Sequence, residues 1–167
     1  MNCLRMPLLA TLLVATAAAT LPARAAATVE VNFVEPENFA DIGFNTVDRE
    51  RVLRDLGDFM KQMGEQRLAD GQTLRINVTD INLAGELKFT PRGDLRVMKG
   101  RADWPEISLR YTLTAGTQTL KSGEVKVYDM AYLQSLRTSE SESAQGHEKR
   151  MLRRWFDETF GKAVAPQ

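Results

Sequence analysis

The stretch Thr73-Leu-Arg-Ile-Asn-Val-Thr-Asp-Ile-Asn-Leu-Ala-Gly-Glu86 has the alternating pattern of a half-buried β-strand. Its even-numbered aliphatic residues, from Leu74 to Val78, predict one face that lies against a core. Continuing this phase would send Asp80 inward, and a lone buried carboxylate is costly. The apolar alternation instead resumes out of phase at Ile81. This shift predicts a β-bulge next to Asp80 that turns the carboxylate outward.

The rest of the chain follows an α+β pattern. Apolar alternation predicts strands at 27–34, around Leu95 and Val97, from Ile107 to Leu113, and through Leu120, Val125 and Val127 after a turn at Ala115-Gly116, with another turn or bulge at Ser122-Gly123. Helical spacing predicts helices from Val47 to about Leu68 and from His147 to about Phe160, with a short helix at 129–133. The expected fold is α+β, a mainly antiparallel twisted sheet of about five strands (β-α-β-β-β-β-α-α) with the helices packed on one face.

Two glycines in the first predicted helix need a physical reason. Gly57 and Gly64 lie seven residues apart at the edge of the apolar stripe, and each costs about 1 kcal/mol relative to alanine inside a helix. We expect close approach of the helix to the sheet to compensate for this cost.

Residues 1–25 have the three parts of a secretory signal peptide. Arg5 precedes an apolar run over 6–20, and Ala23-Arg24-Ala25 forms a small-residue cleavage site. We expect cleavage among Ala25 to Ala27 and a periplasmic location. The only cysteine, Cys3, precedes the apolar run, so we expect neither lipidation nor a disulfide or thiolate site in the mature chain.

The charge balance restricts the classes of partner. The chain has 22 basic and 22 acidic residues, and removal of Arg5 and Arg24 leaves a slight negative excess. A nucleic-acid partner is therefore not expected, because such domains are strongly basic. No second transmembrane segment is expected. Residues 26–167 are predicted to form a single globular domain, with 137–146 as a polar linker before the last helix.

Four stretches of the chain resemble a known family. They are Thr79-Asp-Ile-Asn-Leu-Ala-Gly-Glu86, Trp104-Pro-Glu-Ile-Ser-Leu-Arg-Tyr111, Lys121-Ser-Gly-Glu124 leading to Asp129-Met130, and Glu148-Lys-Arg-Met-Leu152 followed by Trp155-Phe156. In this order they resemble the bacterial secreted family known as domain of unknown function 3016, over about residues 28 to 160. Many members look like exported or lipid-anchored envelope proteins, whereas this chain lacks the lipidation cysteine. The resemblance implies a compartment and an architecture, and it carries no catalytic residues.

The single histidine and several carboxylates could have either catalytic or structural roles. His147, the only histidine, could serve a nucleophilic Ser141 or Ser143, but these serines lie in the polar linker without a strand-turn-helix elbow. We therefore interpret His147 as an exposed first-turn residue. Four carboxylates could converge as metal ligands or as an acid-base pair, although no short Asp-rich loop is present, so capping turns and ion pairs are the simpler roles. These four are Asp80, Glu86, Asp103 and Asp129.

The outer face of the predicted sheet is the candidate binding surface. Its predicted members are Arg75, Arg96, Arg110 and Lys126, together with Asn77, Thr112, Glu124 and Tyr128. Four cations against one anion would attract an anionic envelope ligand or an acidic partner, although a solvated antiparallel face also produces such patterns. Trp104 could stack on a sugar or peptide, or close one end of the core.

These observations favour a non-catalytic binding or accessory module of the cell envelope, exported to the periplasm. An envelope protein or an anionic envelope ligand is the expected partner, and no cofactor is expected. Two alternatives remain open: a metal-dependent hydrolase that uses Asp80, Asp103 and Asp129, and a purely structural envelope component.

Overall fold

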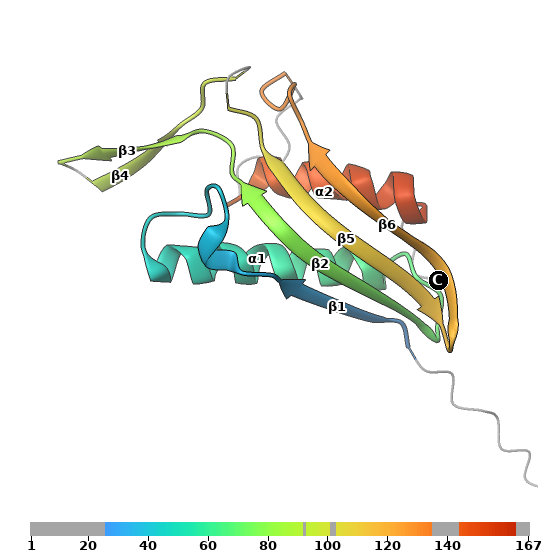
Figure 1. The fold of residues 1–167 in the computed structure, drawn as a ribbon. Coiled ribbons are helices and arrows are strands. Elements are labelled where there is room, and N and C mark those ends of the chain that lie inside the picture. Colours follow the sequence, from blue (N-terminus) through green and yellow to red (C-terminus); the bar gives the residue numbers. More distant parts are fainter. Residues whose placement is uncertain (1–25, 92, 101–102, 135–143, 163–167) are drawn as a thin grey trace, which may run out of the picture.

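The structure, a computed structural model, describes residues 26–91, 93–100, 103–134 and 144–162. The predicted signal segment and most of the predicted linker over 137–146 lie outside these ranges. The elements are β1 (Thr28–Phe33), a 3-10 turn η1 (Pro36–Asn38), α1 (Thr46–Glu65), β2 (Gln72–Asn82), β3 (Glu86–Thr90), β4 (Gly93–Val97), β5 (Glu106–Ala115), β6 (Gln118–Tyr128) and α2 (Gly146–Phe160) (Figure 1).

The strands form two separate sheets. A four-stranded sheet has the order β1-β2-β5-β6, in which β1 runs parallel to β2 and the other neighbours are antiparallel. The strands β3 and β4 pair only with each other, forming a hairpin, here called the arm, that projects from one end of the larger sheet (Figure 1). The α+β prediction is confirmed. The single sheet of about five strands is corrected to four strands plus the arm, because residues 86–90 form a strand that was not predicted and pair with β4 away from the larger sheet.

The bulge in the central strand is confirmed. The register between β2 and β5 shifts between Val78 and Asp80, which leaves Thr79 as the extra residue. The hydroxyl of Thr79 donates to the carbonyl of Ser108 at 3.2 Å. Asp80 then pairs with Ser108 on the uncovered face of the sheet, so its carboxylate stays out of the core.

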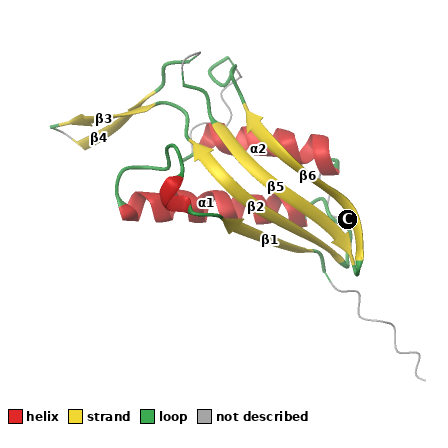
Figure 2. Ribbon diagram, viewed as in Figure 1, coloured by secondary structure: helices red, strands yellow, loops and turns green. Residues whose placement is uncertain are grey.

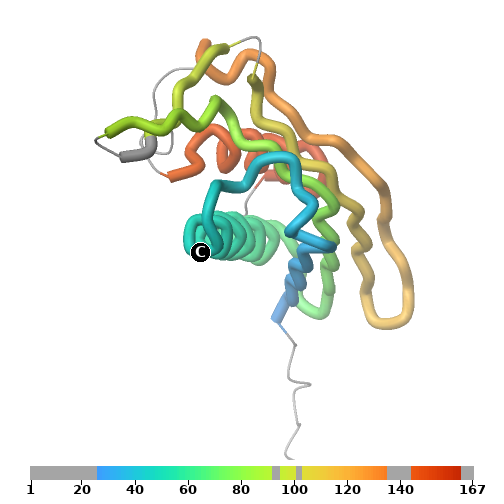
Figure 3. Tube along the Cα trace, turned by 60° about the vertical axis from the view of Figure 1, so that its left-hand side comes forward, coloured from blue at the N-terminus to red at the C-terminus, as the bar shows by residue number. Residues whose placement is uncertain are grey.

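Both helices cover the same face of the four-stranded sheet (Figures 2 and 3). The alternate residues of β2 predicted to face inward are fully buried beneath them. The core residues include Leu56, Met60, Leu74, Ile76, Val78, Ile107, Leu109, Met151, Leu152 and Phe156. The opposite face of the sheet carries no helix in the described part of the chain. Neither helix there has the length and hydropathy that crossing a bilayer requires.

Helix α1 begins and packs as its sequence predicts. The side chain of Asn45 caps it by accepting a hydrogen bond from the backbone N–H of Asp48 at 2.9 Å. A Cβ atom on Gly64 would lie 2.7 Å from a methyl group of Val29, and one on Gly57 would lie 3.4 Å from the Phe33 ring. Both glycines therefore allow close packing of α1 on β1.

Helix α2 contributes an aromatic cluster to the core. The ring of Trp155 lies 4.8 Å from Phe156, and 5.6 Å from both Tyr111 and Phe160. Trp155 is only 6 % exposed. The predicted docking of this helix on the sheet is therefore confirmed.

Two local predictions are wrong. Residues 130–134 form hydrogen-bonded turns rather than a helix, with the backbone N–H of Tyr132 donating to the carbonyl of Asp129. The irregularity in β6 lies at Leu120, not at Ser122-Gly123, because Leu113 pairs with Lys121 and Thr114 with Thr119. Gly123 continues the strand, and the Tyr111 ring packs against its open α-carbon.

Candidate functional site

The open face of the four-stranded sheet holds four of the six predicted binding residues. Cross-strand pairing places Arg75 opposite Thr112, and Ser108 opposite Lys126, on the side away from the helices. Arg110 and the half-exposed Tyr128 lie on the same face. Arg75, Arg110, Lys126 and Tyr128 therefore share one surface, as predicted.

Each cation on this face is paired with a carboxylate. The three ion pairs are Arg75–Glu30 at 2.7 Å, Arg110–Glu124 at 3.2 Å and Lys126–Glu106 at 2.8 Å. The hydrogen bond and charge of Glu106 raise the pKa of Lys126. With Asp80 added, the described face carries three cations and four carboxylates. The predicted excess of positive charge is therefore wrong.

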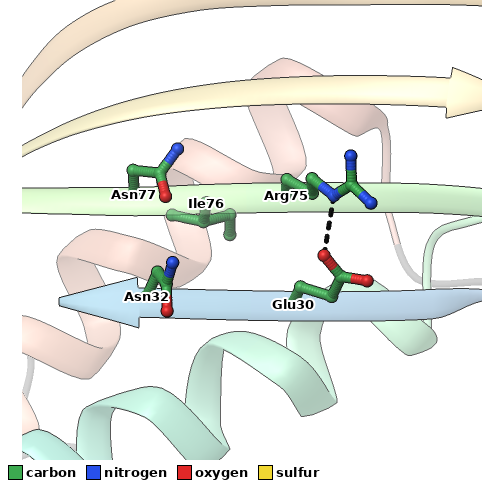
Figure 4. A pocket seen from close by; sticks show the side chains of 5 residues that line it. All are labelled: Glu30, Asn32, Arg75, Ile76 and Asn77. Atoms are coloured by element: carbon green, nitrogen blue, oxygen red, sulfur yellow. Dashed lines mark hydrogen bonds and ion pairs between the residues drawn. The ribbon is translucent and has the colours of Figure 1, made fainter.

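A shallow groove lies on this face between β1 and β2. It has a volume of about 350 Å³ and is lined by Glu30, Asn32, Arg75, Ile76 and Asn77 (Figure 4). The Ile76 side chain is fully buried, so the groove's polar groups come from the other four residues. Asn32 and Asn77 are register partners, and in the described part of the chain neither side-chain amide has a hydrogen-bond partner.

Arg96 lies away from this face, which corrects its predicted position. It belongs to β4 of the arm, and its guanidinium forms a two-point ion pair with Asp41, at 2.8 and 3.2 Å. It also donates to the carbonyl oxygens of Gly85 at 2.9 Å and Ala84 at 3.3 Å. Arg96 therefore fixes the base of the arm instead of binding a ligand on the sheet.

The buried carboxylate of Glu148 holds the base of the arm from the other side. Glu148 is 3 % exposed in the first turn of α2, and its Oε1 accepts a hydrogen bond from the N–H of Ala84 at 2.8 Å. Burial raises the pKa of this carboxyl. Since Arg96 binds the carbonyl of Ala84, charged side chains hold both backbone groups of this residue.

The three aspartates considered as metal ligands are each engaged separately. Asp80 accepts from the N–H of Ala40 at 2.9 Å, and Asp103 accepts from the Tyr132 hydroxyl at 2.8 Å. The 5 % exposed Asp129 faces Arg150 at 3.5 Å. Within the described ranges, no group of three or more His, Cys, Asp or Glu residues is placed to hold a metal ion. The fourth predicted carboxylate, Glu86, forms ion pairs with Lys88 and Lys99.

His147 lies in the first turn of α2, as predicted, but it is half-buried instead of exposed. Its ring meets Tyr132 edge-on with the centroids 4.8 Å apart, and its Nδ1 is buried without a hydrogen-bond partner. Burial and the charge of Arg150 lower the pKa of His147. The proposed nucleophiles Ser141 and Ser143 lie outside the described residues.

Trp104 is half-buried just before β5, next to the buried Pro105. The carbonyl of Pro105 accepts from the N–H of Asp129 at 3.2 Å, which ties this segment to the end of β6. Trp104 lies at the same end of the sheet as Tyr128, because Glu106 is the register partner of Tyr128.

The arm and the start of α1 expose large apolar side chains that the sequence pattern did not indicate as a binding surface. Phe89 on β3 is 60 % exposed and stacks edge-on against Phe44, which is 66 % exposed, with ring centroids 4.4 Å apart. Val47 and Leu95 are 73 % and 57 % exposed. These four residues are here called the arm surface. The alternation of Leu87 and Phe89 is the sequence signal for β3. It is short, and the turn residues Thr90-Pro-Arg-Gly-Asp94 follow it directly.

Parts of the four stretches that carry the family resemblance meet at one end of the fold. These parts are the end of β2, the start of β5, Asp129-Met130 after β6 and the first turns of α2, where Glu148 binds Ala84. Lys121 to Glu124 lies farther back along β6, where Lys121 pairs with Leu113. The family model for proteins of unknown function designated DUF3016 matches residues 27–158. No curated protein matches the sequence. The match covers most of the chain, and the protein therefore belongs to the DUF3016 family.

Proposed function

We propose that this protein is an exported, periplasmic binding module of the cell envelope, without catalysis of its own, that holds a partner protein through the arm surface. The observation that carries this proposal is the exposed aromatic pair Phe44–Phe89. Burying one such side chain stabilises a complex by about 1.5–3 kcal/mol, and both rings remain largely in water here. Clustered exposed apolar side chains are typical of protein-binding surfaces.

The geometry of the arm favours an enclosing partner. Leu95 is the register partner of Lys88, so Leu95 and Phe89 point to opposite faces of the hairpin. The chain's own Phe44 covers part of one face. A partner that contacts both faces would bury the remaining apolar surface.

The base of the arm is held in place, which favours binding of a partner. Arg96 holds the carbonyl oxygens of Ala84 and Gly85 through charge-assisted hydrogen bonds, which are stronger than neutral ones, and Glu148 accepts from the N–H of Ala84. Gly85 has a φ of +84°, and a Cβ atom there would lie 2.9 Å from the carbonyl oxygen of Val97. A fixed base reduces the entropy that is lost on binding.

Export rests on the sequence of residues 1–25. Mass spectrometry of the chain recovered from a periplasmic fraction should give an N-terminus among Ala25 to Ala27. A chain that keeps Met1 and stays with the cytoplasmic fraction would contradict this part of the proposal.

The other expected ligand classes have less support. An anionic ligand would have to displace a carboxylate from each cation on the sheet face. A metal-dependent hydrolase would require Asp80, Asp103 and Asp129 to leave separate hydrogen-bond partners. A partner protein at the arm requires no such rearrangement.

Site-specific photo-crosslinking in cells tests the proposal. A photoreactive residue at position 89 should give one discrete adduct of higher mass, whereas the same residue at Asp58, on the exposed side of α1, should not. The adduct at position 89 should diminish in a Phe44→Ser background. Equal labelling at both positions, or no adduct at position 89, would remove the arm from the proposed function. A deletion strain with altered envelope integrity and no adduct would instead favour a purely structural component.

A further inference from the structure

The groove between β1 and β2 lies on the sheet face, on a different part of the protein from the arm surface. We propose that this groove binds a neutral saccharide, with Asn32, Asn77, Arg75 and Glu30 as its hydrogen-bonding groups. This inference goes beyond the proposed function, because it concerns a second surface and a different class of ligand.

The positions of the four side chains are set by the parallel pairing of the strands. Glu30 is the register partner of Arg75, and Asn32 is the register partner of Asn77. Neighbouring strands lie about 4.8 Å apart, and residues two positions apart on one strand are separated by about 6.6 Å. The four side chains therefore rise from the corners of a small rectangle on one face (Figure 4). One sugar ring can reach all four groups at once.

The chemistry of these groups matches vicinal hydroxyls. Each amide offers a carbonyl acceptor and two N–H donors, and a sugar hydroxyl both donates and accepts. The ion pair joins Nε of Arg75 to Glu30, so the two terminal nitrogens of Arg75 still point away as donors (Figure 4). The groove thus presents both donors and acceptors to a ligand.

Charge distinguishes a neutral ligand from an ionic one. Arg75 and Glu30 are 2.7 Å apart and neutralise each other, and the two remaining groups are uncharged. An anionic ligand would be repelled by Glu30, and a cationic ligand would be repelled by Arg75. A neutral ligand that carries hydroxyl groups is repelled by neither.

The asparagines themselves point to a ligand. Asparagine is depleted in β-strands, yet Asn77 lies in the middle of the central β2, next to Asn32 on β1. Neither amide has a hydrogen-bond partner among the described residues. Residues that break a local preference without internal compensation occur preferentially at functional sites.

The neighbouring strands extend the same polar row. Asn77 is the register partner of Arg110 on β5, which is in turn the partner of Glu124 on β6. The row from Asn32 to Glu124 crosses all four strands. A glycan chain can therefore lie along the row, with one sugar unit in the groove.

Nuclear magnetic resonance titration of the purified protein tests this site. The probes are neutral tetrasaccharides of glucose, mannose and N-acetylglucosamine, the corresponding monosaccharides, and a glucuronate tetrasaccharide. At least one neutral tetrasaccharide should shift the side-chain amide signals of Asn32 and Asn77 in a saturable way. The Asn32→Ala/Asn77→Ala variant should bind that probe at least tenfold more weakly, and Thr112→Ala, on the same face outside the groove, should bind it normally.

The remaining results of the titration identify the ligand or overturn the proposed site. A tetrasaccharide that binds more tightly than its monosaccharide identifies a glycan chain, whereas equal binding identifies a free sugar. Tighter binding of the glucuronate probe would overturn the neutral-ligand inference. No shift with any neutral probe, or shifts that survive in the double variant while its amide spectrum stays folded, would overturn the site itself. Loss of the crosslink at position 89 has no bearing on these results.

Discussion

Replacing Trp155 by alanine should remove the main contact between α2 and the sheet. The indole is 6 % exposed and lies edge-on to three other rings, at centroid distances of 4.8 to 5.6 Å. Tyr111 on β5 is one of these neighbours, so the cluster connects the helix to the sheet. Emptying such a buried aromatic site costs about 3–5 kcal/mol of unfolding free energy, which includes about 0.5–1.5 kcal/mol for each aromatic pair.

Urea unfolding followed by far-UV circular dichroism would measure this change without depending on the lost fluorophore. Glu158→Ala, on the exposed side of the same helix, is the matched control and should change stability by no more than about 0.5 kcal/mol. The loss of unfolding free energy in Trp155→Phe should lie between those of Trp155→Ala and Glu158→Ala. A loss below about 1 kcal/mol for Trp155→Ala would refute the docking of α2 on the sheet.

Two further predictions concern single side chains in the core. Gly64→Ala should destabilise the protein although alanine is the better helix former by about 1 kcal/mol, because its Cβ would lie 2.7 Å from a methyl group of Val29. Adding Val29→Ala should recover part of the loss, and a stabilised Gly64→Ala variant would refute the close packing of α1 on β1. Burial raises the pKa of Glu148, so the folded state binds its proton more readily than the unfolded chain, and stability contributed by this group falls as pH rises through the folded pKa. Glu148→Gln keeps an acceptor for the N–H of Ala84 and carries no charge, so its free energy of unfolding should exceed that of wild type at neutral pH. The difference in free energy should vanish below the ordinary carboxyl pKa of about 4.3. Parallel stability curves against pH would contradict this reasoning.

The elements of the core were predictable because their signals are local. Each apolar pattern indicates which side of its own strand or helix is buried. This holds for the alternation from Leu74 to Val78 and for the helical stripe that ends at Phe160. The bulge before Asp80 was equally local, since a carboxylate out of phase with its neighbours is costly to bury. The first stretch of the family resemblance, Thr79 to Glu86, includes this bulge.

The charge of the sheet face was not predictable, because it depends on which strands are neighbours. Glu30 and Arg75 are 45 residues apart in the chain, and only the parallel pairing of β1 with β2 joins them. Without that pairing, the sequence places no carboxylate beside Arg75. The same missing information placed Arg96 on the sheet instead of on the arm.

The base of the arm had a weaker sequence signal. Glu148 lies three and four residues before Met151 and Leu152, and so it falls on the apolar stripe of α2. A charged residue on such a stripe indicates a buried polar contact. Its partner is a backbone N–H at Ala84, however, and a backbone donor leaves no side-chain pattern to read.

The separation between folding and binding can be measured in a single variant, Phe89→Ser. Phe89 is 60 % exposed, and among the described residues it forms one aromatic pair, with Phe44, worth about 0.5–1.5 kcal/mol, so its loss should leave the fold intact. We expect an unfolding free energy within about 1.5 kcal/mol of wild type, while a photoreactive residue at position 95 loses its adduct to the envelope partner. Loss of the fold in this variant, or an undiminished adduct at position 95, would contradict the role assigned to the arm.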